Sequence, residues 1–228
     1  MGKIEGVCCH FGGQYRASGG SMKTIIFYDV ETTGLPEYSK PSEDPCQPRV
    51  TQIAAELCVE ETGDPLGSMD MLIRPDGWVI PEELQLMTGI TMERANAFGV
   101  PIKHALHAFI ELWTNADQRC GHNESFDARM IRIELMRHTF FAGEMVGAGD
   151  AALPFADYWK AAPIFCTQSG STKIVNAARP AGEKKKTANL REAYLHFAGK
   201  PLEGAHTARA DMLAAKAVYY GIKAHNAA

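Results

Sequence analysis

Residues 25–34 read IIFYDVETTG, and this stretch decides the fold. Its four leading residues are apolar, which is typical of an interior strand covered on both faces rather than of a solvent-exposed edge strand. Asp29 and Glu31 follow two positions apart, so their side chains share one face of the strand while Val30 points to the other. Two carboxylates this close repel each other unless one keeps its proton or cations lie between them. We therefore predict a metal site at the end of this strand.

The composition is that of a soluble globular protein. The 228 residues are 46% hydrophobic and 22% charged, which suits one domain with a sizeable core. No run approaches the roughly 18 apolar residues of a membrane span, and no signal peptide opens the chain. We therefore expect a cytoplasmic protein without a membrane partner. The six cysteines show no regular pairing and are expected to be reduced thiols.

The net charge of −4 argues against a protein that holds nucleic acid mainly through a broad basic surface. It does not exclude a nuclease, because divalent cations bound by carboxylates would supply the positive charge that phosphate needs. Three consecutive lysines at residues 184–186 have two explanations, a solvated charged surface or a phosphate contact, and both stay open.

Residues 1–21 differ in composition from the rest of the chain. They contain six glycines and end in Gly-Gly-Ser before Met22, so we expect a flexible N-terminal leader or an extension derived from cloning. The cluster Cys8-Cys9-His10 lacks the second ligand pair of a four-ligand zinc site. Residues 22–228 are predicted to form a single domain.

The remaining sequence predicts strands first and then alternating helices and strands. The strand that contains Asp29 and the strands at 50–59 and 68–74 suggest an antiparallel meander. The proline-rich loop at 36–48 is expected to be extended and exposed. Helices are expected at 81–89, 101–116, 125–138, 187–198 and 206–224, with short strands at 119–122 and 163–166. This order predicts an α/β domain with a mixed central β-sheet and flanking helices.

Two further acids lie at the starts of predicted helices. Asp127 follows a short strand, at the kind of position where ligand sites gather in open α/β sheets, although a carboxylate there is also favoured by the helix dipole alone. His206 and Asp211 are five residues apart, which corresponds to about 140° on a helix, so both cannot share one helical face. We expect His206 at the helix threshold and Asp211 one turn inside.

The three motifs together resemble those of the DnaQ-like, or DEDDh, exonuclease family, which has an RNase H-like fold. This family includes the proofreading subunit of bacterial replicative polymerases, RNase T, oligoribonuclease and the TREX enzymes. The resemblance covers about residues 24–220. The matching motifs are Asp29-Val-Glu31-Thr-Thr-Gly, His122-Asn123 through Phe126-Asp127, and His206-x-Ala208-x-x-Asp211.

The resemblance implies hydrolysis of the terminal phosphodiester at a nucleic-acid 3′ end, with release of nucleoside 5′-monophosphates. Its cofactors would be two Mg²⁺ ions, for which Mn²⁺ may substitute, and oxygen ligands favour both metals. His206 would act as the general base. The metal ligands would be Asp29, Glu31, Asp127 and Asp211.

The resemblance also implies contacts with the terminal nucleotide. Leu35 would wedge against the last base, although residues 32–35 can also be read as a plain turn, and Phe126 can be read as simple packing. Thr88 stands where the family often has a histidine, in the loop Met87-Thr88-Gly89-Ile90-Thr91. The substrate-binding residues expected on this basis are Thr32, Thr33, Leu35, Asn123 and Phe126.

Other functions share a mixed sheet with clustered acids. The alternatives are a different RNase H-like enzyme, such as an endonuclease or integrase, and an inactive nucleic-acid-binding module. A histidine five residues before the last aspartate favours the exonuclease over the former, and five intact catalytic residue types disfavour the latter. The expected partners are single-stranded or frayed 3′ ends. DNA is favoured, and trimming of RNA 3′ ends, as in oligoribonuclease, is the alternative.

Overall fold

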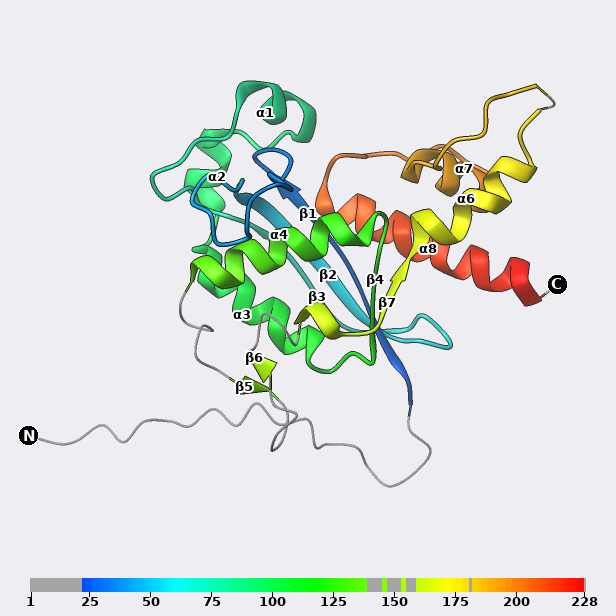
Figure 1. Ribbon diagram of the computed structural model, residues 1–228, viewed down its shortest axis with the longest axis horizontal. Helices are drawn as coiled ribbons and strands as arrows, with labels where there is room; N and C mark the ends of the chain where they lie inside the picture. Colours follow the sequence, from blue (N-terminus) through cyan, green and yellow to red (C-terminus); the bar gives the residue numbers. More distant parts are fainter. Residues whose placement is uncertain (1–21, 139–144, 147–152, 155–158, 181, 228) are drawn as a thin grey trace, which may run out of the picture.

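A computed structural model describes residues 22–138, 145–146, 153–154, 159–180 and 182–227, and these contain a five-stranded mixed sheet with the order β3-β2-β1-β4-β7 (Figure 1). The central strand β1 (Thr24–Thr32) pairs antiparallel with β2 (Val50–Val59), which pairs antiparallel with β3 (Pro65–Leu72). On its other side β1 pairs parallel with β4 (Gln118–Gly121), and β4 pairs parallel with β7 (Ile164–Cys166). The predicted mixed sheet and its meander are confirmed.

Helices cover both faces of this sheet. On one face lie α3 (Ile102–Trp113) and α4 (Glu124–Arg137), and on the other lies α8 (Ala208–Ala227), with α6 (Thr167–Ala177) and α7 (Leu190–Ala198) packed against it (Figure 1). The short helices α1 (Glu82–Thr88) and α2 (Met92–Phe98) follow β3. Two two-residue strands, β5 (Met145–Val146) and β6 (Leu153–Pro154), form a separate antiparallel pair.

The alternation of side chains along β1 fixes which layer each acid meets. Tyr28 and Val30 belong to the core formed with α3 and α4, whereas Ile25 and Phe27 belong to the core formed with α8. Since side chains two apart share a face, Asp29 and Glu31 lie on the α8 side of the sheet. The core itself is dry on both faces, because residues 25–28 have no exposed surface.

The sequence did not predict α2 and α6, and both are weakly amphipathic. The seven residues of α2 bury only Ala95, and the buried residues of α6, at 167, 171 and 175, form one narrow stripe in which only Val175 is apolar. A narrow buried stripe gives little periodic signal, so tertiary contacts decide these helices. The expected leader at residues 1–21, including Cys8-Cys9-His10, lies outside the described residues.

The proline-rich loop is mostly exposed, as expected, but it is not extended, because it folds into successive turns and buries a few of its residues. Within it Ser42 and Gln47 are 5% and 2% exposed. The Nε2 group of Gln47 donates to the carbonyl oxygens of residues 37 and 41, at 3.1 and 3.0 Å. Arg129 of α4 donates to the carbonyl oxygen of Lys40 at 2.8 Å, so hydrogen bonds from α4 hold the loop against this helix.

The described cysteines are free thiols, as expected: Cys46, Cys58, Cys120 and Cys166. Among the described helices, none has the length and apolar character needed to cross a membrane.

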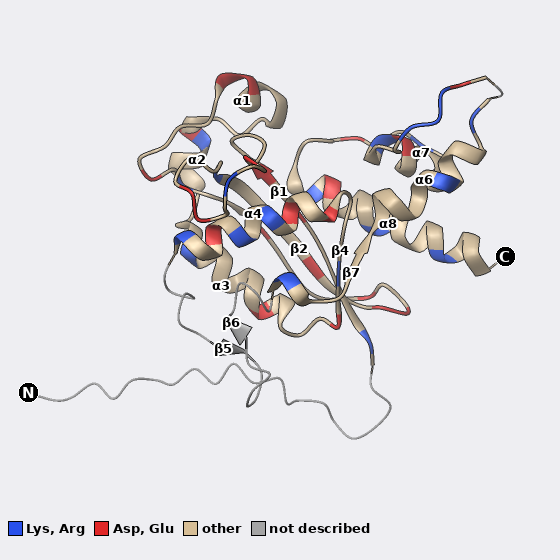
Figure 2. Cartoon of the chain, in the orientation of Figure 1, with Lys and Arg blue, Asp and Glu red and all other residues tan. Residues whose placement is uncertain are grey.

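Charge is distributed unevenly over the chain, with acidic residues on β1 and α1 and basic residues along the connection between α6 and α7 (Figure 2).

Candidate metal centre and catalytic site

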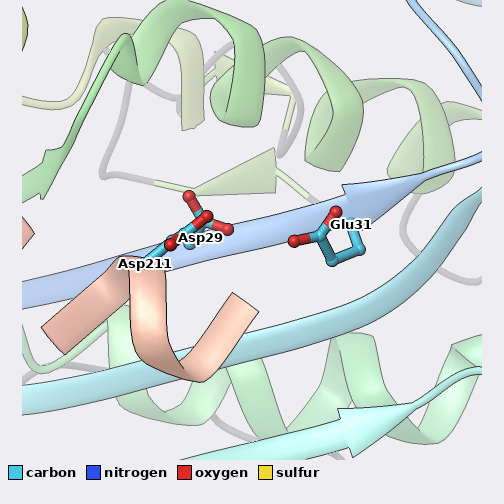
Figure 3. A group of neighbouring side chains, drawn as sticks. All are labelled: Asp29, Glu31 and Asp211. Atoms are coloured by element: carbon cyan, nitrogen blue, oxygen red, sulfur yellow. The ribbon is translucent and has the colours of Figure 1, made fainter. Parts of the chain in front are cut away.

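Three carboxylates converge where β1 ends beneath the first turn of α8. Asp29, Glu31 and Asp211 each place one oxygen so that all three oxygens lie within 4.8 Å of one another (Figure 3). The start of α8 is held there by Gln52, the register partner of Glu31 on β2. Its Oε1 accepts the backbone N–H of Ala208 at 3.2 Å. The sequence predicted these three acids as ligands, but it did not indicate that Gln52 positions the start of α8.

The pKa values of these three groups are raised, and burial is the largest cause for each. For Asp29 the pKa lies well above its ordinary value of 3.8, because burial is reinforced by the charges of Asp127, Asp211 and Glu31. Burial and the charge of Asp211 raise the pKa of Glu31 to about 7. Burial raises the pKa of Asp211, although a hydrogen bond from the His206 backbone opposes this. The folded chain therefore brings carboxylates together at this site without enough positively charged groups to balance them.

Asp127 lies beside this group but is not one of the three. It is 2% exposed in the first turn of α4, and its Oδ1 accepts the backbone N–H of Val30 at 3.1 Å. Burial raises its pKa well above 3.8, the Val30 bond opposes the rise, and its charge in turn raises the pKa of Asp29. The structure thus brings three of the four predicted ligands together and places the fourth next to Asp29.

A buried polar network fixes the start of α4, and sequence reasoning missed it. The Tyr28 hydroxyl donates to Oε1 of Glu124 at 2.7 Å, and Nε of Arg119 lies 2.5 Å from the same oxygen. Arg119 also donates to the carbonyl oxygen of Trp159 and lies over its ring, 4.2 Å from the centroid. Because Glu124 is one turn before Asp127, this network ties the helix that carries Asp127 to β1.

His206 lies at the threshold of α8, as the five-residue spacing predicted. Its backbone is left-handed, with φ of 71°, and its N–H donates to Oδ2 of Asp211 at 3.3 Å. Its Nε2 lies 2.9 Å from Nη2 of Arg191 on α7, a residue to which the sequence gave no role. Neither His206 nor Asp127 belongs to the group of ligand atoms within 4.8 Å.

The expected substrate-binding turn lies at the end of β1 and is held by hydrogen bonds. Thr33 exchanges two hydrogen bonds of 2.8 Å with Arg49, through its backbone N–H and its hydroxyl oxygen. The hydroxyl of Thr32 donates to the carbonyl oxygen of Gly34 at 2.8 Å. Leu35 is 77% exposed and therefore is not the core leucine of a plain turn.

The other two residues expected to contact the substrate differ in their exposure. Asn123 is exposed, with a left-handed φ of 64°, whereas Phe126 is partly buried and packs against the core. His122 bridges two segments, through Nδ1 to the Thr167 hydroxyl at 3.0 Å and Nε2 to the Ala188 carbonyl oxygen at 3.2 Å. Burial lowers the pKa of His122 to about 4. His122 therefore has a structural role, since it joins these two segments.

Comparisons with known proteins identify the family and the fold. A sequence model of the family described as Exonuclease (RNase_T) matches residues 26–219. E. coli exonuclease I in complex with a dA16 oligonucleotide matches with a TM-score of 0.65 and 20% identity over 89% of this chain and 41% of that one. Exonuclease I from Methylocaldum szegediense matches with a TM-score of 0.64 and 22% identity over 89% and 40%. A search of curated proteins finds no match.

These solved structures show that the fold is the RNase H-like one, and the chain spans less than half of their length. The family match runs from β1 into α8, and the matched range includes Asp29, Glu31, Asp127, His206 and Asp211. The acidic group at the end of β1 fits the binding of divalent cations. The chain therefore belongs to this family, the DnaQ-like exonucleases.

Proposed function

We propose that this protein removes nucleotides from the 3′ ends of nucleic acid, with single-stranded DNA as the favoured substrate, by hydrolysing the terminal phosphodiester and releasing nucleoside 5′-monophosphates. The observation that carries the proposal is the group of three carboxylates with raised pKa values at the family's motif positions. The structures with similar folds include E. coli exonuclease I with dT13 and dA16 oligonucleotides, which supports a single strand as ligand.

The residues present fit two divalent cations. Asp29, Glu31 and Asp211 offer carboxylate oxygens, with Asp127 beside them, and hard oxygen ligands favour Mg²⁺ or Mn²⁺. In the described part of the chain, Oδ1 of Asp211 is buried and has no hydrogen-bond partner, as expected of an oxygen that awaits a cation. When bound, such cations supply positive charge to the phosphate under attack and lower the pKa of the attacking water.

The chain's own residues divide the remaining work. We assign proton acceptance to His206, because its neutral imidazole has a lone pair on one nitrogen and it adjoins Asp211 through its backbone. Thr32, Thr33 and Leu35 would support the terminal nucleotide, since their turn is held by hydrogen bonds and leaves Leu35 exposed for contact with a base. Asn123 adjoins the same end of the sheet, and Phe126 would act only through packing.

The distribution of charge supports a path for the nucleic-acid strand over α6 and α7. Residues 173–209 contain eight Lys and Arg against three Glu, a net charge of +5 in a chain whose net charge is −4 (Figure 2). Lys184, Lys185 and Lys186 are all exposed, and Lys186 also pairs with Glu192 at 2.8 Å. This segment also carries Arg191 and His206, so the positive charge adjoins the site.

The test is a side-by-side degradation assay of 3′-labelled and 5′-labelled single-stranded DNA, duplex DNA and RNA in Mg²⁺. We expect 3′ shortening of single-stranded DNA with mononucleotide products. Asp29→Ala should abolish it, and His206→Ala should abolish it while leaving metal binding intact by calorimetric titration. The exposed Glu83→Ala on α1 is the matched control. Absence of 3′ shortening, or full activity in Asp29→Ala, refutes the proposal.

The same assay decides between the proposal and its alternatives. Faster degradation of RNA would favour a 3′-end-trimming exoribonuclease, and internal cuts in a circular single strand would indicate an endonuclease. Binding of the oligonucleotide without any shortening would indicate an inactive binding module. Raised pKa values at four grouped carboxylates disfavour that last outcome, because their mutual repulsion would serve no purpose in a protein that only binds.

A further inference from the structure

The contact between Arg191 and His206 determines which nitrogen of the imidazole accepts a hydrogen bond. Arg191 lies in the first turn of α7, which a capping box between Asn189 and Glu192 stabilises. Its Nη2 lies 2.9 Å from Nε2 of His206. A guanidinium group has hydrogen-bond donors only, so Nε2 must be the acceptor and the proton of the neutral ring must lie on Nδ1.

This arrangement occupies the lone pair that a general base needs. The neutral ring can accept a proton only at Nε2, and there it already accepts one from Arg191. The ring nitrogens also do not belong to the group of oxygens formed by Asp29, Glu31 and Asp211. His206 is held toward α7 in this state, and it cannot act on a water near the carboxylates until the contact with Arg191 opens.

A phosphate is the ligand most suited to open this contact. A hydrogen bond from a guanidinium to a neutral imidazole is single, whereas a phosphate accepts two parallel charge-assisted bonds from the same group. The side chain of Arg191 is exposed and borders an open hollow of about 450 Å³. The hollow is also lined by Gly204 and Ala205, which precede His206, so both sides of the contact have room to move.

We propose that Arg191 is a positioning residue that couples substrate binding to the general base. In the free enzyme it holds His206 toward α7, and when a strand binds, its guanidinium moves to a backbone phosphate near the 3′ end and frees Nε2. This proposal rests on the proposed function, because it takes His206 as the proton acceptor. It adds the residue that determines when His206 is available.

Steady-state kinetics test the phosphate contact with Arg191→Met, which keeps the length of the side chain and removes all donors. The KM for a single-stranded oligonucleotide should rise about tenfold, as expected for one lost charge-assisted contact at a partly solvated site. The kcat should stay within about twofold of wild type, because His206 is free in every bound complex. Arg191→Lys should have a KM between those of wild type and Arg191→Met. An unchanged KM, or a kcat that falls as far as in His206→Ala, overturns the proposal.

The state of His206 itself is read from the ¹⁵N signals of its imidazole at one fixed pH, in Ca²⁺ to allow binding. In free wild type the Nε2 signal should be that of a hydrogen-bond acceptor. A single-stranded oligonucleotide should shift it to the position seen in free Arg191→Met, and an oligonucleotide with uncharged methylphosphonate linkages near its 3′ end should not.

Arg209→Gln is the matched control, since Arg209 is an exposed arginine three residues from His206. It should keep the wild-type Nε2 signal in the free protein. If free Arg191→Met and free wild type give the same signal, the proposal is overturned. Failure of the proposed function is distinguishable, because wild type would then not shorten oligonucleotides whereas the ¹⁵N comparison of the free proteins still reports the contact.

Discussion

The metal-free protein should become more stable when Glu31 loses its charge. Its pKa is about 7 in the folded protein against an ordinary value of 4.5, so the folded state binds a proton more tightly than the unfolded chain does. Below about pH 4.5 the carboxyl is protonated in both states and the free energy of unfolding is unaffected. As the pH rises to about 7, the free energy of unfolding falls progressively, because the unfolded chain ionises more readily than the folded protein. Above that pH the full penalty of the ionised group is present.

The magnitude follows from the size of the shift. A difference of about 2.5 pKa units at about 1.4 kcal/mol each gives a penalty of about 3 kcal/mol at pH 8 and about 1 kcal/mol at pH 5. Glu31→Gln removes the charge and keeps the shape. We expect it to raise the free energy of unfolding of the metal-free protein by these amounts, which at pH 8 corresponds to roughly 6–12 °C in Tm.

The assay is urea denaturation and calorimetry in EDTA at pH 5 and pH 8, with Glu83→Gln as the control because Glu83 is exposed on α1. In saturating Mg²⁺ wild type should be more stable than Glu31→Gln, since cations that bind the folded state stabilise wild type more than a variant lacking one ligand. A variant no more stable than wild type at pH 8 in EDTA, or equally stabilised at both pH values, refutes the reasoning.

Three further predictions concern the groups around the site. Arg119→Met should lower the free energy of unfolding by about 3–5 kcal/mol in urea, because it leaves the buried Glu124 unpaired, and the double variant with Glu124→Leu should recover most of this loss. The pKa of His122 is about 4, below its ordinary 6.5, so its neutral form stabilises the fold above pH 6.5. Wild type should therefore lose about 2 kcal/mol between pH 7.5 and pH 5, a slope that His122→Gln should flatten. Addition of Mg²⁺ after EDTA should raise the Tm of wild type and leave that of Asp211→Asn nearly unchanged, which a thermal shift assay measures.

Local patterns made the sheet and the site predictable to different degrees. The apolar run before Asp29 predicts a covered strand, because burial on two faces leaves no room for polar residues, and the structure confirms it. The 140° between His206 and Asp211 predicts that only one of them lies within the helix, and α8 indeed begins at Ala208. These inferences need only the geometry of one element.

The acids of β1, α4 and α8 could be assigned to one site only through the family resemblance, and the contacts that hold these elements together could not be predicted from the sequence. The position of Asp127 depends on the Val30 backbone and on the network of Tyr28, Glu124 and Arg119, whose members lie up to 96 residues apart. The proline-rich loop lies against α4 because Arg129 and Arg137 of that helix donate to carbonyl oxygens of the loop, which no composition rule indicates. Arg191 likewise reaches His206 only because α7 packs on α8.

The way in which the protein holds its four carboxylates distinguishes a cation site from an ordinary ion-pair network. Asp127 and Asp211 accept backbone N–H groups, and among the described residues none of the four forms an ion pair with Lys or Arg within 4.0 Å. A paired network would lower the carboxyl pKa values, as the cations around Glu192 lower its pKa to about 2. Here the pKa values are raised instead, so positive charge is still missing from the folded chain. Backbone donors orient the oxygens without neutralising them, which leaves the compensation of their charge to divalent cations.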